Sequence, residues 1–257
     1  MSKLEKKIIN ETKILGLDMI NQAQSGHPGI VLSASEIIYS LYAEELNYKR
    51  SLPYWFNRDR FVLSSGHGSA LLYASLYMAG FPITINDLQN FRSLNSITPG
   101  HPEYDLTPGV DSSTGPLGQG IGTAVGLALS ERYFEKLITE LKPKSKIIDY
   151  YTYCLCGDGD LMEGISYESL SFAATQKLNK LIILYDHNRV SLDSKTDLTF
   201  DEDVESRFDA LGFTVLHVKD SNSVDKICEA IEKAKKSKMP SIIIIDTILG
   251  KGLPNEG

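Results

Sequence analysis

Hydrophobic positions recur at two spacings along this chain of 257 residues. In the first half, apolar side chains three to four residues apart predict helices, and a short apolar run over 60–64 predicts one strand. Ser33 stands three residues before Glu36, and this spacing predicts that its hydroxyl caps the second helix. The helices predicted in this half are 4–24, 33–46, 70–80, 85–92 and 123–141.

The second half of the chain alternates strands and helices more regularly. Because such strands must be joined by right-handed crossovers, we expect an α/β fold, a parallel sheet flanked by helices on both faces. No linker rich in Ser, Gly or Pro interrupts the pattern, so residues 1–257 are interpreted as a single domain. The predicted strands are 149–156, 181–186, 213–219 and 241–249, and the predicted helices are 164–177, 201–212 and 224–236.

The composition excludes several classes of protein. The net charge is −7 and the Lys and Arg residues are dispersed, so no basic face for nucleic acid is expected. No apolar run reaches membrane-spanning length, and the first residues lack the apolar core of a signal peptide. Cys154 and Cys156 are expected to be reduced core thiols, because a disulfide framework needs more than the three cysteines present. We therefore expect a cytoplasmic protein without membrane or nucleic-acid partners.

Polar side chains follow two neighbouring predicted strands. Asp158 stands between two glycines after strand 149–156, and Asn188 follows strand 181–186, so both should lie at one edge of the sheet. A carboxylate and an amide oxygen suit a hard cation, Mg2+ or Ca2+, and Gly157 and Gly159 let backbone N–H groups approach an anion. Taken singly, Asp158 is more simply a helix cap and Asn188 a turn residue. Taken together, they favour a site for a diphosphate and its cation.

Two other phosphate-binding motifs do not fit the sequence. A nicotinamide dinucleotide fold requires G-x-G-x-x-G, whereas the glycines here are spaced as G-D-G-D-L-M-E-G. The G-K-G near the C-terminus lacks the Ser or Thr that follows the Lys of a Walker A loop. Neither a dinucleotide-binding nor a P-loop enzyme is predicted.

Three of the five histidines, His27, His67 and His101, directly follow a glycine in loops rich in Gly and Pro. One such histidine is usually solvated or structural, but three suggest imidazoles that face a shared cleft. Proton transfer and hydrogen bonding to a hydroxylated or phosphorylated ligand are their predicted roles. Zinc binding by the same three residues, as in a metal-dependent hydrolase, is the alternative, although no H-x-x-x-H or H-x-H pair supports it.

A long loop over 96–122 contains the glycine-rich stretch SSTGPLGQGIG. Its length is unusual for a connection without function. Gly115, Gly118, Gly120 and Gly122 remove side chains where a helix begins, so either a flat ligand or another backbone segment can come close. The sequence leaves these two interpretations open.

Six motifs resemble the transketolase family in their order and spacing. They are SGHPG, NRDRFVLSSGHGSALLY, TPGHPE, TGPLGQG, GDGDLMEGISYE and FDEDV, and they cover the chain from about Asn21 onward. Glycine–aspartate–glycine after a strand, with an asparagine about 30 residues later, is also the thiamine diphosphate-binding pattern of that family. The resemblance implies the thiamine diphosphate-binding fold, with thiamine diphosphate and Mg2+ or Ca2+ as cofactors.

The resemblance also implies roles for residues around the cofactor. Asp158, Asn188 and the backbone carbonyl of Val190 would hold the cation that clamps the diphosphate. Gly159, with Gly157 beside it, would donate a backbone N–H to a phosphate oxygen. The remaining contacts implied are His67 at the diphosphate and the reacting carbon, Gly115 and Leu117 at the aminopyrimidine, and Val190 and Leu192 at the thiazolium.

Further residues match family positions for substrate and assembly. His27 and His101 match residues that contact the donor ketose, so with His67 they are the predicted catalytic residues. Glu163, which we include in the cofactor site, and Glu168 match acidic residues near the family's dimer interface. We therefore expect a homodimer or higher assembly that acts on sugar phosphates.

The family moves a two-carbon ketol unit from a ketose phosphate to an aldose phosphate, a reaction of the pentose phosphate pathway. Activation of the cofactor needs a glutamate on a second, pyrimidine-binding domain, and the chain ends at Gly257, before such a domain. We expect a truncated piece or, as the less favoured option, the N-terminal subunit of a split enzyme, inactive alone in both cases. A related ketol transferase such as dihydroxyacetone synthase and a non-catalytic module with the same fold are the alternatives.

Two residues depart from the family pattern that we expect. His187 stands where an aspartate is common, and Asp160 stands where a small residue is usual. The first adds a titratable group beside the predicted cation site, and the second adds negative charge near it. Neither replaces a ligand, so cofactor binding is expected to be retained.

Overall fold

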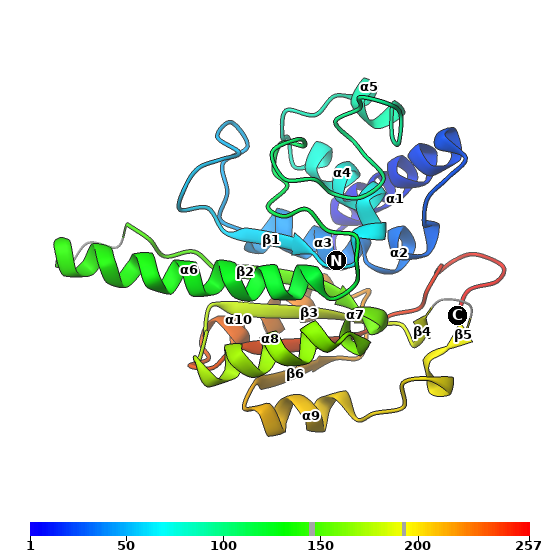
Figure 1. Cartoon of the computed structure of the whole chain (residues 1–257). Coiled ribbons are helices and arrows are strands. Elements are labelled where there is room, and N and C mark those ends of the chain that lie inside the picture. Colours follow the sequence, from blue (N-terminus) through cyan, green and yellow to red (C-terminus); the bar gives the residue numbers. More distant parts are fainter. Residues whose placement is uncertain (144–146, 192–193) are drawn as a thin grey trace.

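The structure is a computed structural model that describes residues 1–143, 147–191 and 194–257 (Figure 1). Within these residues, the centre of the fold is a sheet of five parallel strands. The order of the strands places β1, from the first half of the chain, at one edge beside β2 from the second half. Across the sheet the strands are β1 (Arg60–Leu63), β2 (Thr152–Gly157), β3 (Leu181–His187), β7 (Ser241–Asp246) and β6 (Thr214–Val218).

Helices cover both faces of this sheet, and each face has its own apolar core. One face carries α1 (Lys3–Ala23), α2 (Pro28–Ser33), α3 (Ser35–Tyr39), α4 (Ser69–Met78), α5 (Ile85–Gln89) and α10 (Val224–Lys235). The other carries α6 (Gln119–Leu141), α7 (Asp158–Met162), α8 (Gly164–Thr175) and α9 (Val204–Leu211). Alternate residues of β2 serve the two cores, with Tyr153 and Leu155 on the first and Cys154 and Cys156 on the second. The predicted fold class is confirmed, and both of these cysteines are buried free thiols.

The second helical segment begins earlier than predicted, and Ser33 does not cap it. Pro28 occupies the first turn of α2, where its fixed φ and missing N–H are tolerated. Ser33 is the last residue of α2, and its hydroxyl donates to Oδ2 of Asp186 at 3.3 Å. The chain then continues through α3 into a π-helix, η1 (Ser40–Glu45). The capping prediction was wrong because the serine hydroxyl has a buried acceptor on β3.

Short elements adjoin the strand ends that carry the predicted chemistry. The short helix α7 follows β2 directly, so the GDGD segment is helical rather than a turn that leads to α8. A small hairpin, β4 (Val190–Ser191) and β5 (Ser194–Lys195), follows β3, and the 3-10 turns are η2 (Gly66–Gly68) and η3 (Thr196–Leu198). α6 begins at Gln119, earlier than predicted, after Gly118 with a φ of 77°. In the parts of the chain that are described, no helix has both the length and the apolar character needed to span a bilayer.

Candidate cofactor site

A cavity of about 510 Å³ lies at the edge of the sheet where β2 and β3 end. It gathers predicted site residues that are spread widely along the sequence. Leu192 lies outside the described residues, and Glu163 and Glu168 are exposed at the beginning of α8 and do not line the cavity. The predicted residues that do line it are His27, His67, His101, Gly115, Leu117, Gly157, Asp158, Gly159, Asn188 and Val190.

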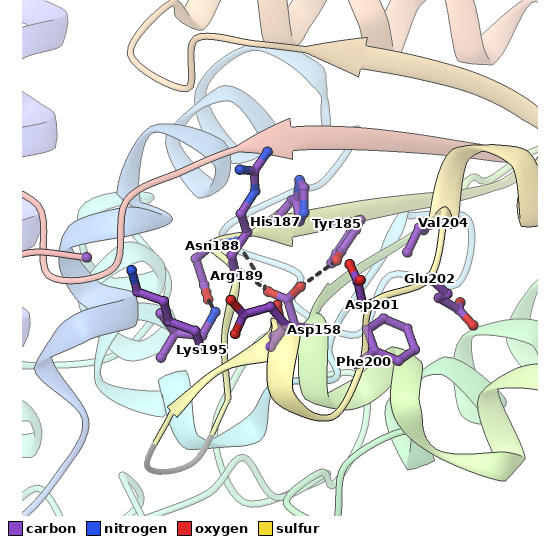
Figure 2. Close-up of a pocket in the computed structure, with 14 residues that line it drawn as sticks. Asp158, Tyr185, His187, Asn188, Arg189, Lys195, Phe200, Asp201, Glu202 and Val204 are labelled. Carbon is purple, nitrogen blue, oxygen red and sulfur yellow. Dashed lines mark hydrogen bonds between the residues drawn. The ribbon is translucent and has the colours of Figure 1, made fainter.

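The carboxylate of Asp158 is held from the side of β3. The residue is 3% exposed, and its Oδ1 accepts a hydrogen bond from the Tyr185 hydroxyl at 2.6 Å. Its Oδ2 accepts the backbone N–H groups of Asn188 and Arg189 at 3.2 and 3.0 Å. Figure 2 shows Asp158 between the Tyr185 ring and the chain at Asn188 and Arg189. Burial raises the pKa of Asp158 above its ordinary value, and these hydrogen bonds offset part of that rise.

Two side-chain oxygens in this cluster keep a free acceptor position. Oδ2 of Asp158 uses both of its lone pairs on backbone N–H groups, whereas Oδ1 uses only one, on Tyr185. Oδ1 of Asn188 accepts one hydrogen bond, from the Val190 N–H at 2.9 Å. Its Nδ2 donates to Oδ2 of Asp186 at 3.3 Å, which fixes the orientation of the amide. Asp158 and Asn188 can therefore each offer one oxygen to a hard cation.

Two buried residues at the end of β3 support this pair, and the sequence analysis did not predict either. Tyr185 donates to Asp158 as described. Asp186 is 2% exposed and accepts hydrogen bonds from Asn188 and from the hydroxyls of Ser33 and Thr247. Burial raises the pKa of Asp186 to about 6, although the hydrogen bonds oppose this rise. The available signal was the polar Tyr-Asp pair that closes the otherwise apolar strand LIILYD.

The three predicted catalytic histidines lie along the same cleft, and the pKa of each is lowered. His27 and His67 pack together, with ring centroids 5.0 Å apart and ring planes at 59°. Burial, and after it the neighbouring His27, lowers the pKa of His67 to about 4. Burial and the Arg92 guanidinium also lower the pKa values of His27 and His101. At neutral pH each imidazole can therefore offer one N–H donor and one acceptor nitrogen.

Arg92 links the loops that carry His27 and His101, and it was not predicted as a site residue. Its backbone has a φ of 61°, in the left-handed region. Its Nη1 donates to Oγ of Ser25 at 2.6 Å, which connects it to the His27 loop. Gly100, beside His101, packs against the guanidinium, since a Cβ there would lie 3.2 Å from Nε of Arg92. No local sequence pattern marks this arginine, because its role depends on two loops that fold over it.

One glycine of the glycine-rich stretch lines the cleft, and another lets two backbone segments come close. Gly115 lines the cleft beside His101, where a Cβ would lie 3.4 Å from the ring Cγ. Gly120 is buried, and a Cβ there would lie 2.5 Å from Cα of Ser64. The first glycine therefore keeps the cleft open, whereas the second allows α6 to pack on the backbone after β1.

The two unusual residues both lie near the predicted cation site, as expected, and the side chain of each has partners within the protein. His187 lines a second cavity of about 580 Å³, the one viewed in Figure 2, and its Nδ1 pairs with Oδ1 of Asp246 at 3.0 Å. Asp160 lines the first cavity together with Asp158 and Asn188, so it lies near the predicted cation site, as expected. Protein donors occupy both of its oxygens, so none of its lone pairs is available to a cation. The donors are Ser64, Ser65, Gly118 and Gly157.

The described parts of the chain contain no metal site built from acidic, histidine or cysteine side chains. Among the residues that the structure describes, no group of three or more His, Cys, Asp or Glu side chains could hold a metal ion. The zinc-dependent alternative based on His27, His67 and His101 therefore has no ligand set there. The Asp158–Asn188 pair is a different kind of site, because one of its ligands is an amide.

Comparison with known proteins gives a consistent set of relatives. The family described as "Transketolase, thiamine diphosphate binding domain" matches residues 4–257. The transketolase of Aquifex aeolicus is 51% identical over 252 residues, which are 98% of this chain and 36% of that protein. The transketolase of Bacillus subtilis is 48% identical over 256 residues, 99% of this chain and 38% of that protein. The solved transketolase from Leishmania mexicana superposes with a TM-score of 0.95 at 42% identity, over 100% of this chain and 38% of that one.

Proposed function

This chain belongs to the family of transketolase thiamine diphosphate-binding domains, and we propose that it provides the diphosphate- and cation-binding half of a ketol-transferring enzyme. It spans little more than a third of the length of its relatives, 36% and 38% in two of them. The proposal is carried by one observation: Asp158 and Asn188, each with a free acceptor position, line the same cleft as three neutral histidines. The whole enzyme would transfer a two-carbon unit from a ketose phosphate to an aldose phosphate in the pentose phosphate pathway.

The cation of this proposal is Mg2+ or Ca2+, bound by Asp158, Asn188 and the backbone carbonyl of Val190. Both ions prefer oxygen ligands, and such sites commonly include carboxylate, amide and carbonyl oxygens. The donor set fits, because the hydrogen bonds from Tyr185 and Val190 leave one lone pair on each side-chain oxygen. Oxygens of a diphosphate and of water would complete the coordination.

Thiamine diphosphate would place its diphosphate at Gly159, because the N–H of the neighbouring Gly157 already donates to Asp160 at 3.0 Å. At Gly159 a Cβ would lie 3.0 Å from Cδ1 of Leu117, so a side chain there would narrow the approach to the backbone N–H. When bound, the cofactor supplies a nucleophilic carbon that also accepts the electron pair of the broken bond. The apolar side chains proposed to contact its rings are Leu117, Val190 and Leu192, together with Leu249, which also lines the cleft.

His27, His67 and His101 would bind and orient the sugar. A neutral imidazole can accept a proton from a sugar hydroxyl at one nitrogen while it donates a hydrogen bond from the other. Burial lowers the pKa values of all three rings, which favours this neutral form. Each ring is therefore prepared for proton transfer without first losing a proton to water.

The rest of the activity is proposed to require residues outside this sequence. A pyrimidine-binding part would activate the cofactor, so this chain alone would not transfer ketol units. A homodimer or higher assembly would bury Glu163 and Glu168, which are exposed at the beginning of α8. The cytoplasm is the proposed compartment, in keeping with the buried free thiols Cys154 and Cys156.

Calorimetric titration of thiamine diphosphate into this chain, in Mg2+ and in EDTA, tests the cofactor site. We expect binding that requires the divalent cation, and equally tight binding in EDTA would contradict the cation assignment. Mixing the chain with a separately produced pyrimidine-binding part should restore ketol transfer from xylulose 5-phosphate that neither part shows alone. Substantial turnover by this chain alone would overturn the proposal that the active site is shared.

A further inference from the structure

Asp160 has a fully buried carboxylate with two hydrogen-bond donors on each oxygen. Its exposed fraction is 0%. Its Oδ1 accepts from the Ser64 hydroxyl at 2.6 Å and from the Gly118 N–H at 2.8 Å. Its Oδ2 accepts from the Ser65 hydroxyl at 2.6 Å and from the Gly157 N–H at 3.0 Å. No lone pair of this carboxylate is left for a ligand.

The four donors belong to three separate segments that surround the candidate cofactor site. Segment 64–65 follows β1 and leads into the turn η2, which carries His67. Gly118 is the N-cap of α6 and directly follows Leu117, which lines the cleft. Gly157 is the last residue of β2, next to the proposed cation ligand. One side chain therefore connects three sides of the cleft.

Glycines bring these segments into direct backbone contact. A Cβ at Gly120 would lie 2.5 Å from Cα of Ser64, and a Cβ at Gly66 would lie 2.8 Å from the backbone nitrogen of Gly115. The carboxylate of Asp160 supplies directional hydrogen bonds at the place where the segments meet.

We propose that Asp160 is a positioning residue whose carboxylate holds the His67 turn and the Leu117 loop at fixed positions relative to the Asp158 segment. The effect of Asp160 on cofactor binding rests on the proposed function. Its effect on the positions of the His67 turn and the Leu117 loop does not. Asp160→Asn is the informative change because it keeps the shape and replaces one oxygen by an NH2 group. Serine hydroxyls can rotate to accept from that group, but the N–H groups of Gly118 and Gly157 cannot. Whichever way the amide is turned, one backbone N–H loses its acceptor.

The imidazole of His67 reports the position of its turn, and NMR titration of the cofactor-free chain can follow it. Burial lowers the pKa of His67 from 6.5 to about 4. If the turn loosens in Asp160→Asn, burial decreases and the pKa of His67 should rise by at least about one unit. If Asp160 acted through its charge alone, loss of the negative charge would lower that pKa further. An unchanged or lower pKa would therefore overturn the proposal.

Cofactor binding gives a second and independent measurement. A loosened cleft should weaken the binding of thiamine diphosphate at saturating Mg2+ by at least about 10-fold. The affinity for Mg2+ alone should change less than about twofold, because the donors to Asp158 are untouched. Equal losses in both would indicate general collapse and contradict a positioning role. If the wild-type chain binds no cofactor, the proposed function fails, while the titration of His67 still decides the role of Asp160.

Glu131→Gln is the matched control, since Glu131 is another buried carboxylate, 4% exposed, that lies on α6 and pairs with Lys180 at 2.6 Å. It should lower stability and leave the pKa of His67 and the cofactor affinity at wild-type values. If Asp160→Asn fails to fold, Ser64→Ala removes one donor and keeps the charge. Both measurements should then shift in the same direction by a smaller amount, and the absence of any shift would overturn the proposal.

Discussion

Asp158 and Asp160 stand on either side of Gly159, and both are buried, yet they belong to different regions of the molecule. The first belongs to the β3 region, where Tyr185 and the backbone after β3 leave one acceptor position of its carboxylate free. The second belongs to the region between β1 and α6, where donors occupy all its acceptor positions. A carboxylate with a free lone pair can bind a ligand, whereas a saturated one holds the protein together.

Hydrogen-bond saturation, rather than residue type or burial, distinguishes the proposed ligand Asp158 from the structural carboxylate of Asp160. The motif GDGD presents two identical residues, each directly after a glycine. Only the strands and loops that fold against each aspartate distinguish them. Each of the following substitutions alters only one of the two regions. Each can therefore contradict the distinction between Asp158 and Asp160.

Asp158→Ala is expected to have the largest effect. Loss of the carboxylate should lower the Mg2+-dependent affinity for thiamine diphosphate by at least about 100-fold. It also leaves the Tyr185 hydroxyl and two backbone N–H groups without their acceptor, so the free energy of unfolding should fall by about 2 kcal/mol. Calorimetry and urea unfolding measure the two effects. Unchanged binding would mean that Asp158 is structural, as Asp160 is, and would remove the distinction.

Gly120→Ala tests the region between β1 and α6. A Cβ there would lie 2.5 Å from Cα of Ser64, which is backbone and cannot rotate away. The free energy of unfolding should therefore fall by about 2 to 3 kcal/mol in urea unfolding. Gly126→Ala on the same helix is the control, because a Cβ there meets nothing within 4 Å. It should stabilise the helix by about 0.5 to 1 kcal/mol, and equal effects of the two changes would contradict the close packing.

His67→Gln should change how stability depends on pH. The pKa of His67 falls from 6.5 in the unfolded chain to about 4 in the folded one, so between these values the unfolded chain binds the extra proton. The free energy of unfolding therefore decreases as pH falls. His67 accounts for a decrease of about 2 kcal/mol between pH 7 and pH 5. The glutamine variant should lack this decrease. The pH-dependent contributions of His27 and His101 are present in both proteins. A stability difference that is the same at both pH values would contradict the burial of this ring.

Tyr185→Phe should have the smallest effect of the four and tests the β3 region. Loss of the hydroxyl frees Oδ1 of Asp158 from its hydrogen bond, so the affinity for Mg2+ should fall about 10-fold and the free energy of unfolding by about 1 kcal/mol. Tyr153→Phe is the control, because the buried Tyr153 hydroxyl has no hydrogen-bond partner in the described residues. The Tyr153→Phe control should lower neither the affinity for Mg2+ nor the free energy of unfolding. Equal effects in both variants would show that Tyr185 does not orient the ligand.

The fold class and much of the site could be predicted because both depend on local patterns. Apolar runs at strand spacing and amphipathic segments between them predicted a parallel sheet with helices on both faces, as found. Asp158 and Asn188 could be paired in advance because parallel strands end at the same edge. The glycine-flanked histidines were also expected to meet, and they line one cleft.

The remainder depends on contacts between distant segments, which local patterns do not encode. Arg92 matters because the His27 and His101 loops close over it, and Asp186 because Asn188 and two hydroxyls converge on it. Ser33 had the spacing of a helix cap, but a buried acceptor on β3 took its hydroxyl. The position of β1 beside β2 likewise follows from the whole sheet rather than from either strand alone.

The neighbouring positions of β1 and β2 also have a consequence for protein synthesis. Ser64 and Asp160, which meet beside the cleft, are 96 residues apart in the sequence. Contacts of such long range close large loops and form slowly compared with helices and hairpins. The three histidine loops leave the ribosome first. The hydrogen bonds from Ser64 and Ser65 to Asp160 can form only after the chain up to Asp160 has been synthesised. Competence to bind the cofactor is therefore gained late, and a nascent chain that stops before β2 cannot acquire it.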